Sequence, residues 1–497
     1  MEDLSREELI ELARGQAARL EEQDRRLEEQ DRRLEEQDRQ IEALRAELDR
    51  LRRLLTRNSG NSSMAPSGDD LPGRTKPLDK PARPTGRRRG KQRGAPGSGL
   101  ERVADPDHLE SVYPKACCGC GQALDERLHE LAGYLALQQV EVPLMTAAVT
   151  EFRLHRLRCG CGTVTQAPRP AGLADAPVSY GPNVATLAVY LLVFHAVPVE
   201  RVSRLIADVT GARPSPGFVH GMIARAAGLL AGFERLVTAL IVAAHVVHFD
   251  ETTLRCGPKG TKKYVWTAAT ARYTLYYLGD RSKAAFLDFG IAGCFAGIAV
   301  HDYYAVYYSK GVFNTGVRHQ LCTAHIIRHL TDAAECHPGS YWPAQALRAL
   351  RGLIHAHHQA RDAGLAAVPA EIREPLITEF RQAVLVGLSE IGRRPGNTTQ
   401  LPARNLLECL RDRHDDVIGF CFDTRIPPTN NQAETDLRPQ KTQQKISGRL
   451  QSEAVTRDRL RIRSYLSTAA KHRVDVMTAL RDAIIGTPWM PPAPIRA

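Results

Sequence analysis

The chain has 497 residues, which is long enough for several domains and a substantial buried core. Its formal net charge of +11 and its pI near 9.2 favour a polyanionic partner. Uninterrupted apolar runs reach only about a dozen residues, too short to span a membrane, and the acidic, amphipathic N-terminus is not typical of a secretory signal peptide. The cations are concentrated in two stretches: residues 71–98 carry nine Lys/Arg against one acid, and residues 435–473 carry ten against three. We expect nucleic-acid contacts there.

Residues 1–56 are predicted to form a coiled coil. Leucine or isoleucine recurs every seven residues from Leu20 to Leu55, and the sequence LEEQDRR is nearly repeated three times. With these residues at heptad position a, position d is occupied by Gln23, Gln30, Gln37, Leu44 and Leu51. The seam is therefore polar in its first half and apolar in its second half. We expect the helix to form a homo-oligomer; the alternative is a lone charged helix held by Glu–Arg pairs.

Residues 57–100 are rich in Asn, Ser, Gly, Pro and basic side chains, which predicts a disordered basic linker. A glycine-flanked run in this linker holds Arg87, Arg88, Arg89 and Lys91. Such an arm suits the narrow minor groove of A·T-rich DNA. The alternative is a solvated tail that binds any nucleic acid through counterion release.

Residues 101–170 are predicted to form a zinc-finger-like module of the zinc-ribbon kind. Two glycine-flanked cysteine pairs, about forty residues apart, offer four thiolates, which is the usual ligand set of a structural Zn²⁺ site. The predicted ligands are Cys117, Cys120, Cys159 and Cys161, with Cys118 as a spare. The alternative is a set of unligated thiols in a reducing cytoplasm. Further along, Cys322-x-x-His325 resembles a ligand pair, but no second pair answers it, so helix packing is predicted.

Residues 171–238 are predicted to be helical and to include a helix-turn-helix DNA-binding unit. One amphipathic segment spans residues 197–209, and residues 211–214 break it. A second helix then begins with Ser215 as its N-cap and Pro216 at its first position. Because this geometry is common in proteins that never touch DNA, a purely structural role is the alternative.

Two apolar runs in the next domain, residues 239–475, each end in an aspartate. Residues 241–249 precede Asp250, and residues 298–301 precede Asp302. Such short runs predict buried strands, and packing does not explain a carboxylate at the end of a buried strand. A single aspartate after a strand is more often a turn residue, but two of them in a basic chain indicate a site. Two further strands, joined by a tight turn, are predicted at residues 263–270 and 273–278.

A third acid, Glu434, lies at the start of a predicted helix. A proline pair breaks any earlier helix, Asn431 is a suitable N-cap, and Glu434 falls in the first turn. Steps of four, three and four residues place Arg438, Lys441 and Lys445 on the same face, where they can grip a phosphate backbone. The alternative is a capping box, Asn431-x-x-Glu434, followed by solvated cations.

These elements together predict a multidomain α/β protein with a ribonuclease-H-like catalytic core. In such a core Asp250, Asp302 and Glu434 would hold two Mg²⁺ or Mn²⁺ ions, because hard cations take oxygen ligands. A helical insertion at about residues 340–422 accounts for the long separation of Asp302 from Glu434. Residues 476–497 are left as a C-terminal tail.

Five segments resemble, in order and spacing, the insertion-sequence-66 (IS66) family of bacterial transposases: HFDET, HDYYAVY, HQLCTAHIIRHL, TNNQAETDLRPQKTQQKISG and RSYLSTAAK. The resemblance extends over nearly the whole chain. It implies a DDE-type site, with Asp250 and Asp302 as the aspartates and Glu434 as the glutamate. It also implies a zinc-finger-like module, DNA partners (element ends and target), element-encoded accessory proteins, and a location in the bacterial cytoplasm, at the nucleoid.

We therefore expect a transposase that cleaves DNA at the ends of an insertion sequence and joins the liberated 3′-hydroxyl to target DNA. Two alternatives stay open. One is a catalytically inactive, domesticated protein that binds DNA through zinc. The other is a ribonuclease-H-like nuclease that only hydrolyses its substrate. Mutational decay into an inactive protein should have altered at least one of Asp250, Asp302 and Glu434. All three are present, which favours an active enzyme.

Overall fold

The computed structural model describes residues 6–56, 100–142, 145–170, 173, 175–394, 396 and 400–492. The basic linker, with Arg87, Arg88, Arg89 and Lys91, lies outside the described residues. The minor-groove arm therefore stays a prediction.

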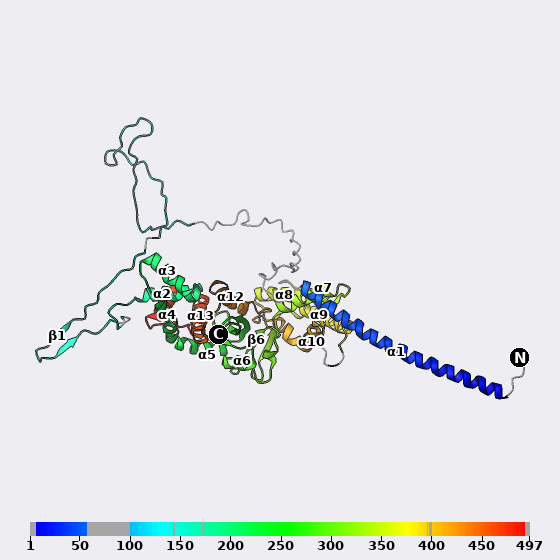
Figure 1. Ribbon diagram of the computed structural model, residues 1–497. Helices are drawn as coiled ribbons and strands as arrows, with labels where there is room; N and C mark the ends of the chain where they lie inside the picture. Colours follow the sequence, from blue (N-terminus) through cyan, green and yellow to red (C-terminus); the bar gives the residue numbers. More distant parts are fainter. Residues whose placement is uncertain are drawn as a thin grey trace.

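The N-terminal segment is one long helix, α1 (Arg6–Thr56), which extends away from the rest of the described chain (Figure 1). Its heptad residues are exposed wherever their side chains are described: Leu20, Leu27, Leu34, Ile41, Leu44, Leu48 and Leu51. Short intrahelical ion pairs between glutamate and arginine support its surface, for example Glu29 with Arg33 at 2.7 Å. The helix is as predicted. Its pairing with a second copy stays a prediction.

The described residues between 100 and 180 run as extended excursions with little regular structure (Figure 1). Their one described sheet is a two-stranded ribbon of β1 (Arg156–Arg158) and β2 (Val164–Gln166), which pair antiparallel. Both cysteine pairs lie in this region.

The centre of the molecule is a five-stranded mixed sheet in the order β5-β4-β3-β6-β7. β3 pairs antiparallel with β4, and β4 with β5, whereas β6 runs parallel to both β3 and β7. The strands are β3 (Val246–Leu254), β4 (Lys263–Ala269), β5 (Thr274–Gly279), β6 (Ile298–His301) and β7 (Arg318–Leu321). A short helix, α6 (Lys283–Asp288), and a 3₁₀ turn, η3 (Ala305–Tyr308), connect them.

The prediction of a strand over residues 241–249 is wrong at its start. Ile241 belongs to helix α5 (Ala231–Val242), and β3 begins at Val246 and continues past Asp250 to Leu254. The apolar run is shared between a helix end and a strand, because a continuous apolar run has no periodicity that tells the two apart. Asp250 therefore lies inside a strand, not at its tip.

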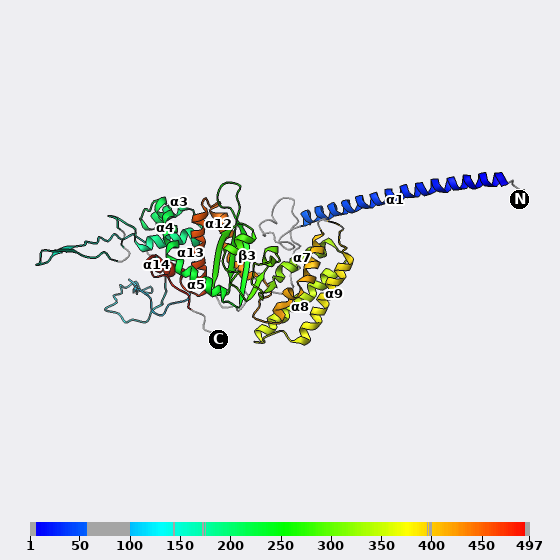
Figure 2. The same cartoon turned by 90° about the horizontal axis from the view of Figure 1, so that it is seen from below.

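Helices on one side of the sheet form the larger hydrophobic core with it (Figure 2). They are α2 (Pro182–Val189), the π-helical turn η2 (Tyr190–Phe194), α3 (Val199–Thr210), α4 (Pro216–Leu229), α5, α13 (Glu453–Lys471) and α14 (Val476–Ile484). The predicted turn between α3 and α4 is confirmed: Gly211 closes α3 at φ 75°, and the Ser215 hydroxyl caps α4 by accepting the N–H of Phe218 at 3.1 Å.

A second hydrophobic core joins β6 and β7 to a group of helices on the opposite side (Figure 2). These helices are α7 (Thr323–Cys336), α8 (Trp342–Asp362), α9 (Ala370–Glu390), α10 (Pro402–Asp412), α11 (His414–Ile418) and the 3₁₀ turn η4 (Gly419–Cys421). The helices predicted between residues 340 and 422 are thus confirmed. Helix α12 (Asn431–Ile446) follows and packs against β3 and β4. None of the described helices combines the length and apolar character needed to cross a membrane.

Candidate active site

Asp250 and Asp302 lie at corresponding positions of two neighbouring parallel strands. β3 and β6 pair in parallel, with His248 opposite Val300. Two residues further on lie Asp250, within β3, and Asp302, directly after β6. Because parallel strands advance together, this register brings both carboxylates to the same end of the strand pair.

The surroundings of Asp250 are strongly acidic. Burial, and then the charges of Glu251, Asp302 and Glu434, raise the pKa of Asp250 well above its ordinary value. The N–H of Glu251 donates to Asp250 Oδ1 at 2.8 Å, which opposes this rise only in part. Asp302 Oδ1 accepts the N–H of Tyr304 at 2.9 Å, so this aspartate also shapes the turn after β6. Two of these neighbours, Asp302 and Glu434, complete the predicted set with Asp250, and Glu251 is a fourth acid.

Helix α12 is held against β3 by the buried side chain of Asn430. Its Nδ2 donates to the carbonyl oxygen of Phe249 at 2.7 Å, and its Oδ1 lies 3.0 Å from Nδ1 of His248. Burial lowers the pKa of His248 to about 4, so the ring is neutral and we assign the Nδ1 proton as the donor. This contact fixes the start of α12 beside Asp250.

Asn430, and not Asn431, is the N-cap of α12, and its side chain makes no cap hydrogen bond. The prediction of Asn431 as the N-cap is therefore wrong, because Asn431 is already the first helical residue. The side-chain amide of Asn430 is hydrogen-bonded to β3 instead. Glu434 becomes the fourth residue of the helix, whereas a capping box requires the third. The capping-box alternative for Glu434 is excluded by this geometry.

The carboxylate of Glu434 faces His325, a residue of α7. Glu434 Oε1 is buried and has no hydrogen-bond partner, and the same is true of Nδ1 of His325. The two atoms are 3.9 Å apart, which is too long for a hydrogen bond. Burial lowers the pKa of His325, although the charges of Asp302 and Glu434 oppose the shift. A neutral imidazole and a carboxylate thus face each other across a gap.

Cys322 completes a group of three ligand atoms with His325 and Glu434. Its Sγ and one atom from each of the other two side chains lie within 4.8 Å of one another. Burial raises the pKa of Cys322 to about 11. No second pair of ligands joins Cys322-x-x-His325 in this group; the third ligand atom comes from Glu434 of α12, more than a hundred residues away in sequence, and the predicted packing role of Cys322 stays a prediction.

Glu251 is a site residue that the sequence does not reveal. Its Oε1 accepts two hydrogen bonds from Arg281, at 3.0 and 2.8 Å, and its Oε2 accepts the hydroxyl of Tyr307 at 2.8 Å. The Arg281 guanidinium also lies over the ring of Tyr304, 4.0 Å from its centroid. Burial and the charge of Asp302 nevertheless raise the pKa of Glu251. Among the described residues, neither Asp250 nor Asp302 has an ion pair of this kind.

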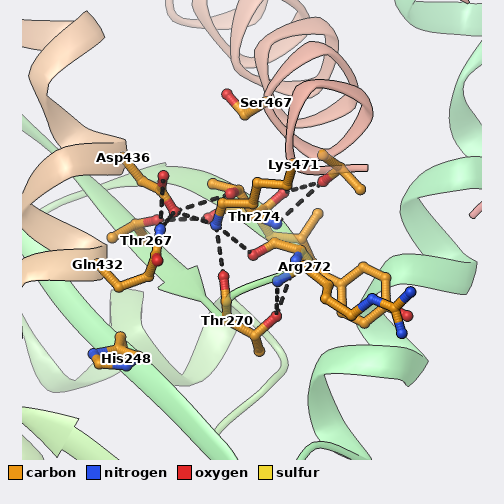
Figure 3. A network of polar contacts seen from close by, with 12 residues as sticks. His248, Thr267, Thr270, Arg272, Thr274, Gln432, Asp436, Ser467 and Lys471 are labelled. Atoms are coloured by element: carbon orange, nitrogen blue, oxygen red, sulfur yellow. Dashed lines mark hydrogen bonds and ion pairs between the residues drawn. The ribbon is translucent and has the colours of Figure 1, made fainter. Parts of the chain in front are cut away.

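A buried ion pair fixes the other side of α12. Asp436 Oδ2 accepts hydrogen bonds from Lys471 Nζ at 2.6 Å and from the Thr274 hydroxyl at 2.9 Å (Figure 3). The same ammonium group donates to the carbonyl oxygens of Thr270 at 2.7 Å and Tyr273 at 3.0 Å. Helix α12 is therefore tied to β5 and α13 by Asp436, two residues after Glu434.

The three predicted DNA-binding cations of α12, Arg438, Lys441 and Lys445, are all exposed. Lys441 is near enough to the site for its charge to lower the pKa of His325. Buried residues of α12, such as Asp436 and Leu437, face the sheet instead. Helix α12 thus has one face that packs against the sheet and another, exposed face that carries the cations.

The four predicted zinc ligands lie in two separate turns. Cys117 and Cys120 share the first, closed by the N–H of Gly121 on the carbonyl of Cys117 at 2.9 Å. Cys159 and Cys161 share the second. The four sulfurs do not meet: in the described part of the chain, Cys322, His325 and Glu434 are the one such ligand group within 4.8 Å. The zinc site stays a prediction.

A sheet with adjoining carboxylates and a cationic helix beside them is typical of an enzyme that processes nucleic acid. The family model described as "Transposase IS66 family" matches residues 177–457, more than half of the chain. The chain therefore belongs to the IS66 family of transposases. This membership implies DNA as a partner and the use of divalent metal ions. No curated protein was found to match the chain.

Proposed function

We propose that the protein is a DDE-type transposase that cleaves DNA at the ends of an insertion sequence and joins them to target DNA. The observation that carries the proposal is the convergence of three carboxylates: the charges of Asp302, directly after β6, and of Glu434, in α12, both act on Asp250 in β3. The strand order and directions of the sheet agree with a ribonuclease-H-like core.

The donor set fits hard divalent cations. Three carboxylates gather with little compensating positive charge, and Glu434 keeps one buried oxygen without a hydrogen-bond partner. Asp250, Asp302 and Glu434 would hold the ions, here proposed to be two Mg²⁺ or Mn²⁺. When bound, such ions supply an activated nucleophile and stabilise the leaving oxygen of a phosphodiester.

In this proposal the side chains of the protein position the DNA strands for two successive steps. Water attacks the phosphorus at the element end, the P–O3′ bond breaks, and the 3′-oxygen leaves as a hydroxyl. That 3′-hydroxyl then attacks the phosphorus of a target phosphodiester and loses its proton; a new P–O bond forms, the P–O3′ bond of the target breaks, and the released 3′-oxygen takes up a proton. We assign Arg438, Lys441 and Lys445 to the DNA backbone, because they are exposed on the helix that presents Glu434.

The outlying segments have supporting roles in this proposal. The exposed heptad stripe of α1 would pair with a second copy, as an enzyme that brings two DNA ends together requires. Cys117, Cys120, Cys159 and Cys161 would bind one structural Zn²⁺ when their two turns come together. Arg87, Arg88, Arg89 and Lys91 would follow the minor groove.

The test incubates the purified chain with labelled element ends, target DNA and Mg²⁺ and separates the products by size. Joined products of end and target are expected. Cleavage without joining would instead indicate a nuclease, and DNA binding without cleavage would indicate a domesticated DNA-binding protein.

A further inference from the structure

Cys322, His325 and Glu434 form a second, chemically distinct donor set beside the proposed catalytic carboxylates. Thiol, imidazole and carboxylate come together from the start of α7 and the first turns of α12, with their ligand atoms within 4.8 Å of one another. The hard ions proposed for the carboxylate site prefer oxygen alone, whereas this set is typical of Zn²⁺ and similar borderline cations.

Local geometry explains why the cysteine and the histidine face the same way. Cys322 is the N-cap residue of α7, and its sulfur makes no cap hydrogen bond. His325 lies three residues later, on the same side of the helix start. The Cys322 sulfur accepts the backbone N–H of Asn430 at 3.1 Å, so the segment that delivers Glu434 also orients the sulfur. Such outer hydrogen bonds are the usual support of a metal ligand.

Two of the three ligand atoms have no hydrogen-bond partner among the described residues. Nδ1 of His325 and Oε1 of Glu434 are both buried and unbonded, 3.9 Å apart. A buried polar atom without a partner is costly, and most such atoms in proteins are satisfied. A tetrahedral Zn²⁺ with ordinary bond lengths separates its ligand atoms by about 3.3–3.6 Å, so only small side-chain adjustments are needed to satisfy both.

We propose that Cys322, His325 and Glu434 bind a borderline divalent cation, with Zn²⁺ as the natural candidate, and that this ion withdraws Glu434 from the carboxylate site. Zinc at this position would inhibit Mg²⁺-dependent cleavage. The binding stands on the geometry of the three side chains. The inhibition rests on the proposed function, because it requires Glu434 to take part in cleavage.

The binding test strips the full chain of bound metal with a chelator, titrates it with Co²⁺, and compares the absorption of the wild type with that of Cys322→Ser. Cobalt bound to a thiolate gives a sulfur-to-metal charge-transfer band, so the difference between the two proteins reports the Cys322 ligand. The wild type should gain a stronger band than Cys322→Ser, because Cys117, Cys120, Cys159 and Cys161 contribute equally in both proteins; the serine can still accept the Asn430 N–H. Cys409→Ser, a half-buried cysteine elsewhere, is the matched control and should keep the band.

Two results would overturn the binding: no band in the wild type, or a band of equal intensity in Cys322→Ser. His325→Gln is the second variant, because it leaves the sulfur in place and removes the nitrogen ligand. Loss of an outer-shell partner commonly costs about 10–100-fold in metal affinity, so loss of this direct ligand should weaken Co²⁺ binding roughly tenfold or more. Unchanged affinity in a folded His325→Gln protein would also overturn the proposal.

The inhibition test titrates Zn²⁺ into Mg²⁺-dependent cleavage of labelled ends. The wild type should be inhibited, and Cys322→Ser should need roughly tenfold more Zn²⁺ for the same inhibition. Equal inhibition of both proteins would show that zinc acts on the carboxylates alone, against the proposal. If the wild type shows the stronger cobalt band but no cleavage at any Mg²⁺ concentration, the proposed function fails and the metal site stands.

Discussion

The side-chain amide of Asn430 donates a 2.7 Å hydrogen bond to the carbonyl oxygen of Phe249, the residue that precedes Asp250 in β3. One buried contact therefore links the strand carrying the first aspartate to the helix carrying Glu434. The carbonyl of Phe249 requires a donor at this point, and only the amide half of the side chain supplies it.

Asn430→Asp should destabilise the protein and slow cleavage. The substitution places a carboxylate oxygen against the Phe249 carbonyl and leaves both without a donor, at a cost of about 1–3 kcal/mol. Thermal unfolding and cleavage of labelled ends measure the two effects. Asn431→Asp is the matched control, because Asn431 is exposed, and its effect should stay within about 0.5 kcal/mol. Equal effects at both positions would contradict the anchoring role of Asn430.

Lys471→Met should cost about 3–5 kcal/mol, because it leaves the buried carboxylate of Asp436 uncompensated. Denaturant unfolding measures the loss. Arg457→Met is the control: its ion pair with Glu453 spans 3.1 Å but is exposed, so the change should lie within about 1 kcal/mol. If the two variants unfold alike, the pair in Figure 3 does not hold α12.

Asp250→Asn should stabilise the protein in Mg²⁺-free buffer while abolishing cleavage. The pKa of Asp250 is raised in the folded state above its ordinary value of 3.8, so the folded chain retains a proton that the unfolded chain releases. Wild-type stability must therefore fall as pH rises from that ordinary value through the raised one. Asparagine does not titrate, so the stability of Asp250→Asn should not fall in this way. At neutral pH the variant should therefore be more stable than the wild type by about 1 kcal/mol. Melting temperatures of both proteins across pH test the sign; parallel curves would refute it.

Replacing Ile41 and Leu48 by aspartate should dissociate the oligomer, because unpaired charges buried in a helix seam cost several kcal/mol. Light scattering measures the mass. The control is Arg25→Asp with Arg32→Asp, two charge changes at heptad position f, outside the seam, which should leave the mass unchanged. An unaltered mass in the seam variant would place any association elsewhere in the chain.

The sequence predicts those parts of the fold that depend on local patterns. β6 was expected at residues 298–301 and begins and ends there, and Ser215 caps α4 as its hydroxyl and the following Pro216 indicate. Where a run is apolar on every side, as around Ile241, the pattern does not distinguish helix from strand, and the predicted boundary is wrong.

The site is less predictable, because its contacts join residues far apart in the chain. Glu434 could be recognised from the cations that follow it, but the roles of Asn430 and His325 depend on α12 packing beside β3 and α7. Glu251 follows Asp250 directly and could be taken for a turn residue. Its bonds to Arg281 and Tyr307 give it a place in the acidic cluster. No periodicity or spacing encodes such long-range pairs.

The most direct test of the account compares cleavage by the wild type with cleavage by Glu434→Gln at saturating Mg²⁺ and DNA. Glutamine has a helix propensity close to that of glutamate and nearly the same shape, so the melting temperature and DNA affinity should change little. Cleavage should fall by orders of magnitude, because one anionic oxygen ligand is lost. Cleavage by Glu434→Gln at the wild-type rate would contradict the assignment of Glu434, and with it the proposed three-carboxylate site.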